Sequence, residues 1–168
     1  MPFDSQSKAL ANELVDLLKV QKKLITTIES CTGGLLAGAI TRISGSSAVF
    51  EGGFITYSNA AKTAMVGVPE YLFASHGAVS VQVAASMAEG GLKTAGANLA
   101  LSVTGIAGPT GGCEEKPVGM VCFGLCYRDA EDQLMTYAQV KQFGDIGRDQ
   151  VREASVLYAL NWAVETLK

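Results

Sequence analysis

Ser30 is the residue whose neighbours point most directly to chemistry, in the segment Glu29-Ser30-Cys31-Thr32-Gly33-Gly34. A β-branched run precedes this segment and a helical pattern follows it, so Ser30 stands between a strand and a helix, where open α/β sheets bind their ligands. The N–H groups of a helix's first turn can hold a phosphate or stabilise an oxyanion. The alternative is that Ser30 or Thr32 only caps the helix and that the two glycines relieve crowding against the sheet.

A serine hydroxyl needs a base before it can attack a carbonyl carbon, and two residues qualify. His76 is the only histidine, so a Ser-His scheme depends on it, but no G-x-S-x-G motif surrounds Ser30. Lys62 follows Tyr57 by five positions. A lysine buried beside a serine loses its charge readily because burial disfavours the ammonium form, and a tyrosine hydroxyl can relay or donate a proton. For either base, the alternative is an ordinary surface residue.

Cys31 is a second possible nucleophile. Neighbouring residues on an extended backbone point in opposite directions, so at most one of Ser30 and Cys31 should face a pocket. We choose Ser30 and assign Cys31 to packing. Of the other cysteines, Cys113, Cys122 and Cys126, the last two are expected to lie on one strand face as buried thiols. With one histidine and no CxxC pair, we expect no metal site and no other cofactor.

A glycine-rich loop, 104–112, follows an apolar strand and could wrap a ligand. It matches neither the dinucleotide fingerprint nor the P-loop, but Thr104 and the N–H groups after it can recognise a polar group. The alternative is an ordinary turn. Lys116 could bring a cation to the same rim. Arg148 and Arg152 begin the last helix, where the dipole disfavours cations, so they suit a phosphate or carboxylate unless they form surface ion pairs.

The elements that must position these residues follow from apolar periodicity and turn residues. Helices are predicted from Asp4 or Ser5 as cap, over 35–43, from Asn59 as cap of a short helix carrying Lys62, over 81–95 with Ser80 as cap, and from about 147 to the end. Strands are predicted over 24–28, 49–57, 98–103, 118–127 and 134–142, with glycines at 52 and 53 marking a bulge or a close backbone approach. No linker divides the chain. We therefore expect one α/β domain over residues 1–168, with a mixed sheet flanked by helices in three layers.

Composition excludes several classes of protein. The chain has 168 residues, 48% hydrophobic and 17% charged, which excludes a disordered chain. Its 13 Lys+Arg against 16 Asp+Glu give a net charge of −3, which argues against a nucleic-acid binder. No apolar run approaches the ~18–20 residues that span a bilayer, and the first residues do not form a signal peptide. We expect a cytoplasmic protein without nucleic-acid or membrane partners.

Five short motifs occur in order along the chain: Glu29-Ser30-Cys31-Thr32-Gly33-Gly34, Tyr57-Ser58-Asn59 with Lys62, Gly77-Ala78-Val79-Ser80, Thr104-Gly105-Ile106-Ala107-Gly108-Pro109 and Lys116-Pro117-Val118-Gly119. Together they resemble the C-terminal domain of the competence/damage-inducible protein CinA, from about residue 7 to 167. Stand-alone members of this family are nicotinamide-nucleotide amidohydrolases, also called NMN deamidases. The resemblance therefore implies hydrolysis of the carboxamide of nicotinamide mononucleotide to nicotinate mononucleotide and ammonia, in pyridine-nucleotide salvage.

The resemblance also implies roles for single residues. Ser30 is expected to be the nucleophile, Lys62 its base and Tyr57 an assisting hydroxyl, while N–H groups of the Thr32-Gly33 turn steady the oxyanion. Arg148 departs from the family's Gly-Asp-Arg pattern, because Ile146-Gly147 separates it from Gly144-Asp145. The expected substrate-binding residues are Thr32, Gly33, Gly34, Thr104, Gly105 and Arg148.

Other interpretations are kept beside this one. The expected partner is a small-molecule pyridine nucleotide, and a homodimer or higher homo-oligomer is expected because isologous contacts often use surfaces with little charge. The chain could instead be a non-catalytic module that binds a nucleotide or a partner, or it could hydrolyse another small amide. The presence of Ser30, Tyr57 and Lys62 together favours an enzyme, since a binding module has no need of all three.

Overall fold

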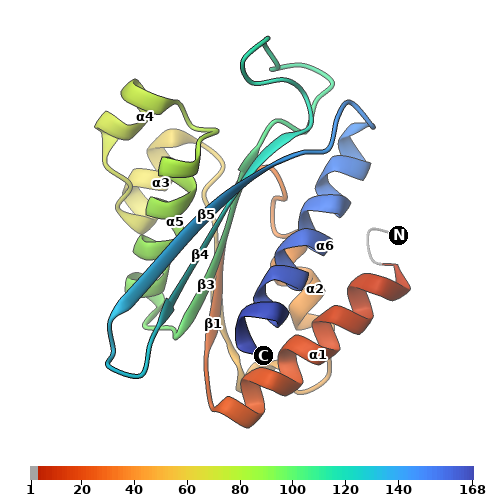
Figure 1. The fold of residues 1–168 in the computed structure, drawn as a ribbon, viewed down its shortest axis with the longest axis vertical. Coiled ribbons are helices and arrows are strands. Elements are labelled where there is room, and N and C mark those ends of the chain that lie inside the picture. The colour runs from red at the N-terminus through yellow and green to blue at the C-terminus, as the bar shows by residue number, and fades with distance from the viewer. Residues whose placement is uncertain (1–3) are drawn as a thin grey trace.

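A five-stranded mixed sheet forms the middle layer of this computed structural model, which describes residues 4–168 (Figure 1). The strands lie in the order β2-β1-β3-β4-β5. Strands β2, β1 and β3 are parallel to one another, β4 is antiparallel to β3, and β5 is antiparallel to β4. Their bounds are Ile25–Glu29 for β1, Phe50–Ile55 for β2, Leu99–Gly105 for β3, Met120–Arg128 for β4 and Leu134–Gln142 for β5. The predicted α/β fold with a mixed sheet is thus confirmed.

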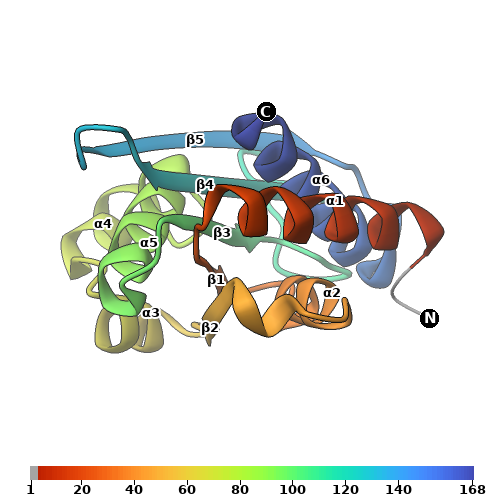
Figure 2. The ribbon, with the colours of Figure 1, turned by 90° about the horizontal axis from the view of Figure 1, so that it is seen from below.

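Helices cover both faces of the sheet, as Figure 1 and the view from below in Figure 2 show. One face carries α1, α2 and α6, and the other carries α3, α4 and α5. The helices are α1 Ser5–Gln21, α2 Leu35–Thr41, α3 Asn59–Val66, α4 Glu70–His76, α5 Val81–Ala95 and α6 Arg148–Leu167, with a 3₁₀ turn at Ser46–Ala48.

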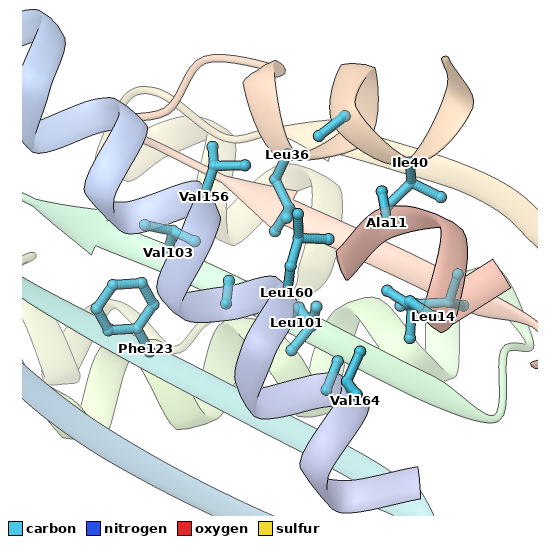
Figure 3. Close-up of a cluster of buried hydrophobic side chains, with 14 of the residues drawn as sticks. Ala11, Leu14, Leu36, Ile40, Leu101, Val103, Phe123, Val156, Leu160 and Val164 are labelled. Carbon is cyan, nitrogen blue, oxygen red and sulfur yellow. The ribbon is translucent and has the colours of Figure 1, made fainter. Parts of the chain in front are cut away.

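Two apolar clusters hold the layers together. The larger lies between the sheet and α1, α2 and α6, and Figure 3 shows Leu36 of α2, Val156 and Leu160 of α6 and Val103 of β3 meeting there. The smaller lies beneath α3, α4 and α5 and includes Ile28 of β1. The alternation of a strand explains the division, since successive side chains of β1 point to opposite faces. Burying both faces fixes the position of the parallel strands between two helical layers.

Helix caps confirm two predictions and correct a third. Asp4 accepts a hydrogen bond from Ser7 N at the start of α1, and Ser80 caps α5. The prediction of Asn59 as the cap of α3 was wrong. Ser58 has the extended conformation of a cap and its Oγ accepts from Ala61 N at 3.0 Å, so Asn59 is the first residue of the helix.

The short helix α4 was not predicted, because its sequence was interpreted as a connection. None of its residues is buried and no side chain caps it. Only the adjacent residues Leu72 and Phe73 pack against the smaller cluster, and two neighbouring apolar positions do not give the periodicity from which helices are recognised in a sequence.

Strand β2 shows both features that its glycines suggested. The register between β1 and β2 shifts after Ile25, which places a bulge next to Gly52. A Cβ on Gly53 would lie 2.8 Å from Thr27 Oγ1, so a larger residue would separate the strands.

The carboxyl ends of β1, β2 and β3 meet at one edge of the sheet, because these strands are parallel. Ser30 follows β1, Tyr57 lies just beyond β2, and Thr104 is the next-to-last residue of β3. The fold therefore brings three of the chemically interesting segments to one place. Among the helices of residues 4–168, none is both long and apolar enough to cross a bilayer.

Candidate active site

A lysine amine and a serine hydroxyl meet at this edge of the sheet. Lys62 Nζ lies 3.2 Å from Ser30 Oγ and donates to the carbonyl oxygen of Thr56 at 2.9 Å. Ser30 comes from the end of β1, and Lys62 comes from the first turn of α3, which the Ser58 cap orients toward the sheet. Lys62 is only 1% exposed and Ser30 is 9% exposed. The two groups are thus in hydrogen-bonding contact inside the protein.

The surroundings of Lys62 favour its neutral form. Burial lowers the pKa of Lys62 from its ordinary value, and the nearby Cys31 thiol opposes this only in part. The hydrogen-bond partners of Nζ are a hydroxyl and the carbonyl oxygens of Thr56 and Tyr57, none of which carries a full charge. A neutral amine in contact with a serine hydroxyl can accept its proton, which is the chemistry of a general base.

Cys31, the neighbour of Ser30, is buried. Its thiol packs in the larger apolar cluster, and burial raises the pKa of Cys31 to about 12. A thiol nucleophile needs to ionise, so this environment makes Cys31 unreactive. The structure thus packs the Cys31 thiol in the core, as the sequence predicted.

His76 does not meet Ser30. It is exposed at the last residue of α4, and its backbone carbonyl accepts a hydrogen bond from Lys116 Nζ. A base must be within hydrogen-bonding distance of the hydroxyl that it activates, directly or through one water. Of the two bases considered from the sequence, the structure therefore brings only Lys62 to Ser30.

Ser30 and Lys62 open into a cavity of about 220 Å³. Its lining includes six of the residues predicted for the site, whereas Thr32, Gly33 and Gly34 lie outside it. Asn59 was expected only as a helix cap, and its position on the cavity follows from Ser58 taking that role. The lining residues are Ser30, Cys31, Tyr57, Asn59, Lys62, Ala78, Val79, Thr104, Gly105, Ala107 and Arg148.

The N–H groups of the first turn of α2 already have a hydrogen-bond partner within the protein. The buried carboxylate of Glu29 accepts hydrogen bonds from Leu36 N at 2.8 Å and Ala37 N at 3.0 Å. Neither Ser30 nor Thr32 caps this helix, since its N-cap is Gly34 with no side-chain bond. The expectation that these N–H groups are free for a phosphate or an oxyanion was therefore wrong. A carboxylate at a helix N-terminus satisfies the N–H groups and complements the dipole.

Gly33 and Gly34 allow the backbone conformation of the turn and do not line the cavity. Gly33 has φ +55° and Gly34 has φ +101°, a region that side chains with a Cβ rarely adopt. These values help to turn the chain from β1 into α2 within the five residues 30–34. The N–H of Gly33 is also used, because it donates to the carbonyl of Ser30 at 3.0 Å.

Tyr57 and Arg148 form the rim of the cavity. The guanidinium of Arg148 donates to Tyr57 Oη at 3.1 Å and to the carbonyl of Gly108 at 2.8 Å. The Tyr57 side chain is 61% exposed, and its hydroxyl bonds with Arg148 instead of Ser30 or Lys62. Thr104 supports the opposite wall, where its Oγ1 donates to the carbonyl of Ala78 at 2.9 Å.

Arg152 lies one helical turn after Arg148 and contacts different atoms. Its Nε donates to the carbonyl of Cys31 at 3.0 Å and its Nη2 to the carbonyl of Thr32 at 3.2 Å. The sequence offered Arg152 as a partner for a phosphate or carboxylate, but the structure directs its guanidinium to the backbone that follows Ser30. Within residues 4–168, no group of three His, Cys, Asp or Glu side chains is placed to hold a metal ion.

The chain is similar to known proteins over nearly its whole length. Residues 7–167 match the model of the CinA C-terminal domain. The nicotinamide-nucleotide amidohydrolase PncC of Shigella flexneri is 49% identical over 94% of this chain and 92% of its own length. A CinA-like protein of Citrifermentans bemidjiense is 45% identical over 95% of this chain, which spans 37% of that longer protein. The crystal structure of the competence/damage inducible protein CihA from Agrobacterium tumefaciens superposes with a TM-score of 0.91 at 43% identity, covering 98% of this chain and 97% of that one.

Proposed function

Because the chain belongs to the family of CinA C-terminal domains, we propose that it hydrolyses the carboxamide of nicotinamide mononucleotide to nicotinate mononucleotide and ammonia. The name of the Shigella flexneri relative supports this activity, at 49% identity over nearly the whole of both chains. The observation that carries the proposal is the contact between Ser30 Oγ and the buried amine of Lys62, at 3.2 Å on a cavity.

In the proposed first half-reaction, the neutral Lys62 amine takes the proton of the Ser30 hydroxyl. Ser30 Oγ then attacks the amide carbon and forms a C–O bond, so that the carbonyl oxygen becomes an oxyanion. When this intermediate collapses, the C–N bond breaks and Lys62 returns its proton to the leaving nitrogen. Ammonia departs, and the nicotinoyl group remains attached to Ser30 as an ester.

In the second half-reaction, Lys62 takes a proton from a water molecule that attacks the ester. The C–O bond to Ser30 breaks, and Ser30 Oγ recovers the proton from Lys62. The sum is one amide and one water converted to one carboxylic acid and one ammonia, with the enzyme unchanged. The same base therefore serves both halves. The positive charge of the pyridinium ring withdraws electrons and makes the amide carbon a better electrophile.

We assign the phosphate of the substrate to the rim. Three cations were available from the sequence, but Lys116 binds the carbonyl of His76 and Arg152 binds those of Cys31 and Thr32. Arg148 borders the cavity and uses two of its five N–H donors, so it retains donors for a phosphate. Tyr57 then assists from the rim, beside Arg148, where the ribose phosphate would lie.

The alternative of a non-catalytic binding module explains the site less well. A module that only binds a nucleotide has no need to bury a lysine without a carboxylate partner, which costs free energy whether or not the amine is charged. Hydrolysis of another small amide is the remaining alternative, because the machinery of Ser30 and Lys62 does not depend on the ring. A homodimer or higher homo-oligomer also stays a proposal, which sedimentation of the purified protein tests.

The test of the proposed function is product analysis by mass spectrometry, with nicotinamide, nicotinamide riboside and nicotinamide mononucleotide as substrates. We expect metal-free wild-type protein to convert the mononucleotide to nicotinate mononucleotide and ammonia. The variant Ser30→Ala should lose about 10³-fold or more of this activity, while Ser47→Ala, at an exposed serine in the 3₁₀ turn, should retain it. Tight binding of the mononucleotide without product would favour the binding module, and turnover of nicotinamide alone would favour another amide.

A further inference from the structure

The turn that carries Ser30 is held by a guanidinium that does not line the cavity. Arg152 Nε and Nη2 bind the carbonyl oxygens of Cys31 and Thr32, the two residues that follow Ser30. A guanidinium presents its donors in a rigid planar fork, so two bonds to neighbouring carbonyls restrain both peptide planes at once. Arg152 therefore controls the geometry of this turn, although it does not itself border the cavity.

The packing of α6 keeps Arg152 in place. Val156 lies one turn after Arg152 and packs in the larger apolar cluster with Leu36 of α2, as Figure 3 shows. Gly33 lies beside the guanidinium, because a Cβ at this position would lie 3.4 Å from Arg152 Nη2, an ordinary contact distance. The turn after β1 and helix α6, which are far apart in the sequence, thus pack closely around Arg152.

The turn also presents a hydrogen-bond donor next to the nucleophile. The carbonyl of Ser30 accepts from Gly33 N, and in a planar trans peptide the N–H of Cys31 points away from that carbonyl. Cys31 borders the cavity beside Ser30, and its thiol also packs in the larger apolar cluster. The N–H groups of Leu36, Ala37 and Gly33 are already bound within the protein. Between Ser30 and α2, the N–H groups of Cys31, Thr32 and Gly34 donate no backbone hydrogen bond, so they remain available to an oxyanion formed at Ser30.

We propose that Arg152 is a positioning residue for catalysis, which holds the turn so that Ser30 Oγ and an available N–H group of the turn are aligned on one substrate carbonyl. This role rests on the proposed amidohydrolase function. Arg152 does not contact the substrate in it. It predicts an effect of Arg152 on the chemical step and not on binding, because an aligned oxyanion donor acts on charge that develops only in the transition state.

The test uses the variants Arg152→Lys and Arg152→Gln in the full chain, with nicotinamide mononucleotide as substrate. We expect kcat to fall by about 10²-fold in Arg152→Gln, with KM within about threefold of the wild-type value because no substrate contact is lost. A lysine supplies one point charge in place of the fork, so Arg152→Lys should recover only part of kcat. As a matched control, Arg128→Gln removes an arginine at the far end of β4 and should leave both constants unchanged.

A second measurement separates positioning from a general loss of structure. The aldehyde analogue of the mononucleotide can form a tetrahedral adduct with Ser30, and its affinity should fall in proportion to kcat/KM across the Arg152 variants. If Arg152 instead held the phosphate, KM would rise with kcat preserved, and the riboside would be insensitive to the substitution; that result would overturn the proposal. An unchanged kcat in Arg152→Gln would overturn it as well. Failure of the amidohydrolase function is distinguishable, because the wild-type protein would then release no ammonia.

Discussion

Lys62 Nζ lies 2.9 Å from the carbonyl oxygen of Thr56, closer than its 3.2 Å to Ser30 Oγ. The backbone after β2 therefore holds the amine that faces the nucleophile. A neutral amine has two N–H donors, which the carbonyls of Thr56 and Tyr57 can accept, and one lone pair. The lone pair is then left for the Ser30 hydroxyl, which is the arrangement that a base requires.

Lys62→Arg tests whether the amine acts as a base or only as a positive charge. An arginine keeps the charge and the donors but does not lose its proton in proteins, so the variant should lose about 10²–10⁴-fold in kcat/KM. Lys62→Met should lose a similar factor. Lys93→Arg, at an exposed lysine of α5, is the matched control and should be fully active. Ammonia release gives the rates, and an active Lys62→Arg would remove the base assignment.

The pH dependence of catalysis follows from the same group. Because burial lowers the pKa of Lys62 below its ordinary value of 10.5, the neutral amine forms at lower pH than in a free lysine. We expect kcat/KM of the wild-type protein to rise with pH through an apparent pKa below 10.5. A rate that rises only near 10.5 would show that the amine is charged over most of the working range.

Stability should depend on pH through Lys62 as well. A lowered pKa means that, between the folded-state pKa and 10.5, the unfolded chain binds more protons than the folded protein. The free energy of unfolding contributed by this group therefore rises with pH through this window and is lost as pH falls through it. Lys62→Met lacks this dependence and should be more stable near neutral pH by about 1 kcal/mol. Urea unfolding at several pH values measures how the free energy of unfolding of the wild-type protein and of Lys62→Met changes with pH. An equal change in the two proteins would contradict the prediction.

Arg148→Gln tests the assignment of the phosphate. Loss of charge-assisted hydrogen bonds to a phosphate should raise KM for the mononucleotide by about 10–100-fold. Nicotinamide riboside has no phosphate, so its kinetics should change little. The matched control is Arg128→Gln, because Arg128 lies at the end of β4 and forms an ion pair with Asp132. An equal loss for both substrates would place Arg148 in the chemistry or the fold, and not at the phosphate.

Glu29→Gln tests the carboxylate beneath α2. Glu29 is 1% exposed, and it accepts hydrogen bonds from the N–H groups of Leu36 and Ala37. An amide loses the charge that complements the helix dipole and can turn a donor toward those groups, so the variant should be less stable by about 1–3 kcal/mol. Glu51→Gln, at an exposed glutamate of β2, should be neutral. Denaturant unfolding compares the two, and equal stabilities would show that Glu29 is not needed for the helix.

The sequence alone determined the features that depend on neighbouring residues. The β-branched run before Ser30 and the glycines after it predicted a strand followed by a tight turn into a helix, and Cys31 was assigned to packing. The order of strands and helices predicted the α/β domain with its mixed sheet. These inferences succeeded because propensity, periodicity and side-chain direction act over a few residues.

Tertiary structure decided which distant residues meet. It brought Lys62 rather than His76 to Ser30, gave the N–H groups of α2 to Glu29 and directed Arg152 to the backbone of Cys31 and Thr32. Position along the chain carries no information about such contacts, because 32 residues separate Lys62 from Ser30 and 121 separate Arg152 from Cys31. They arise when parallel strands end at one edge of the sheet and the helices are packed on its two faces. Burial, and with it the lowered pKa of Lys62, exists only once that packing has formed.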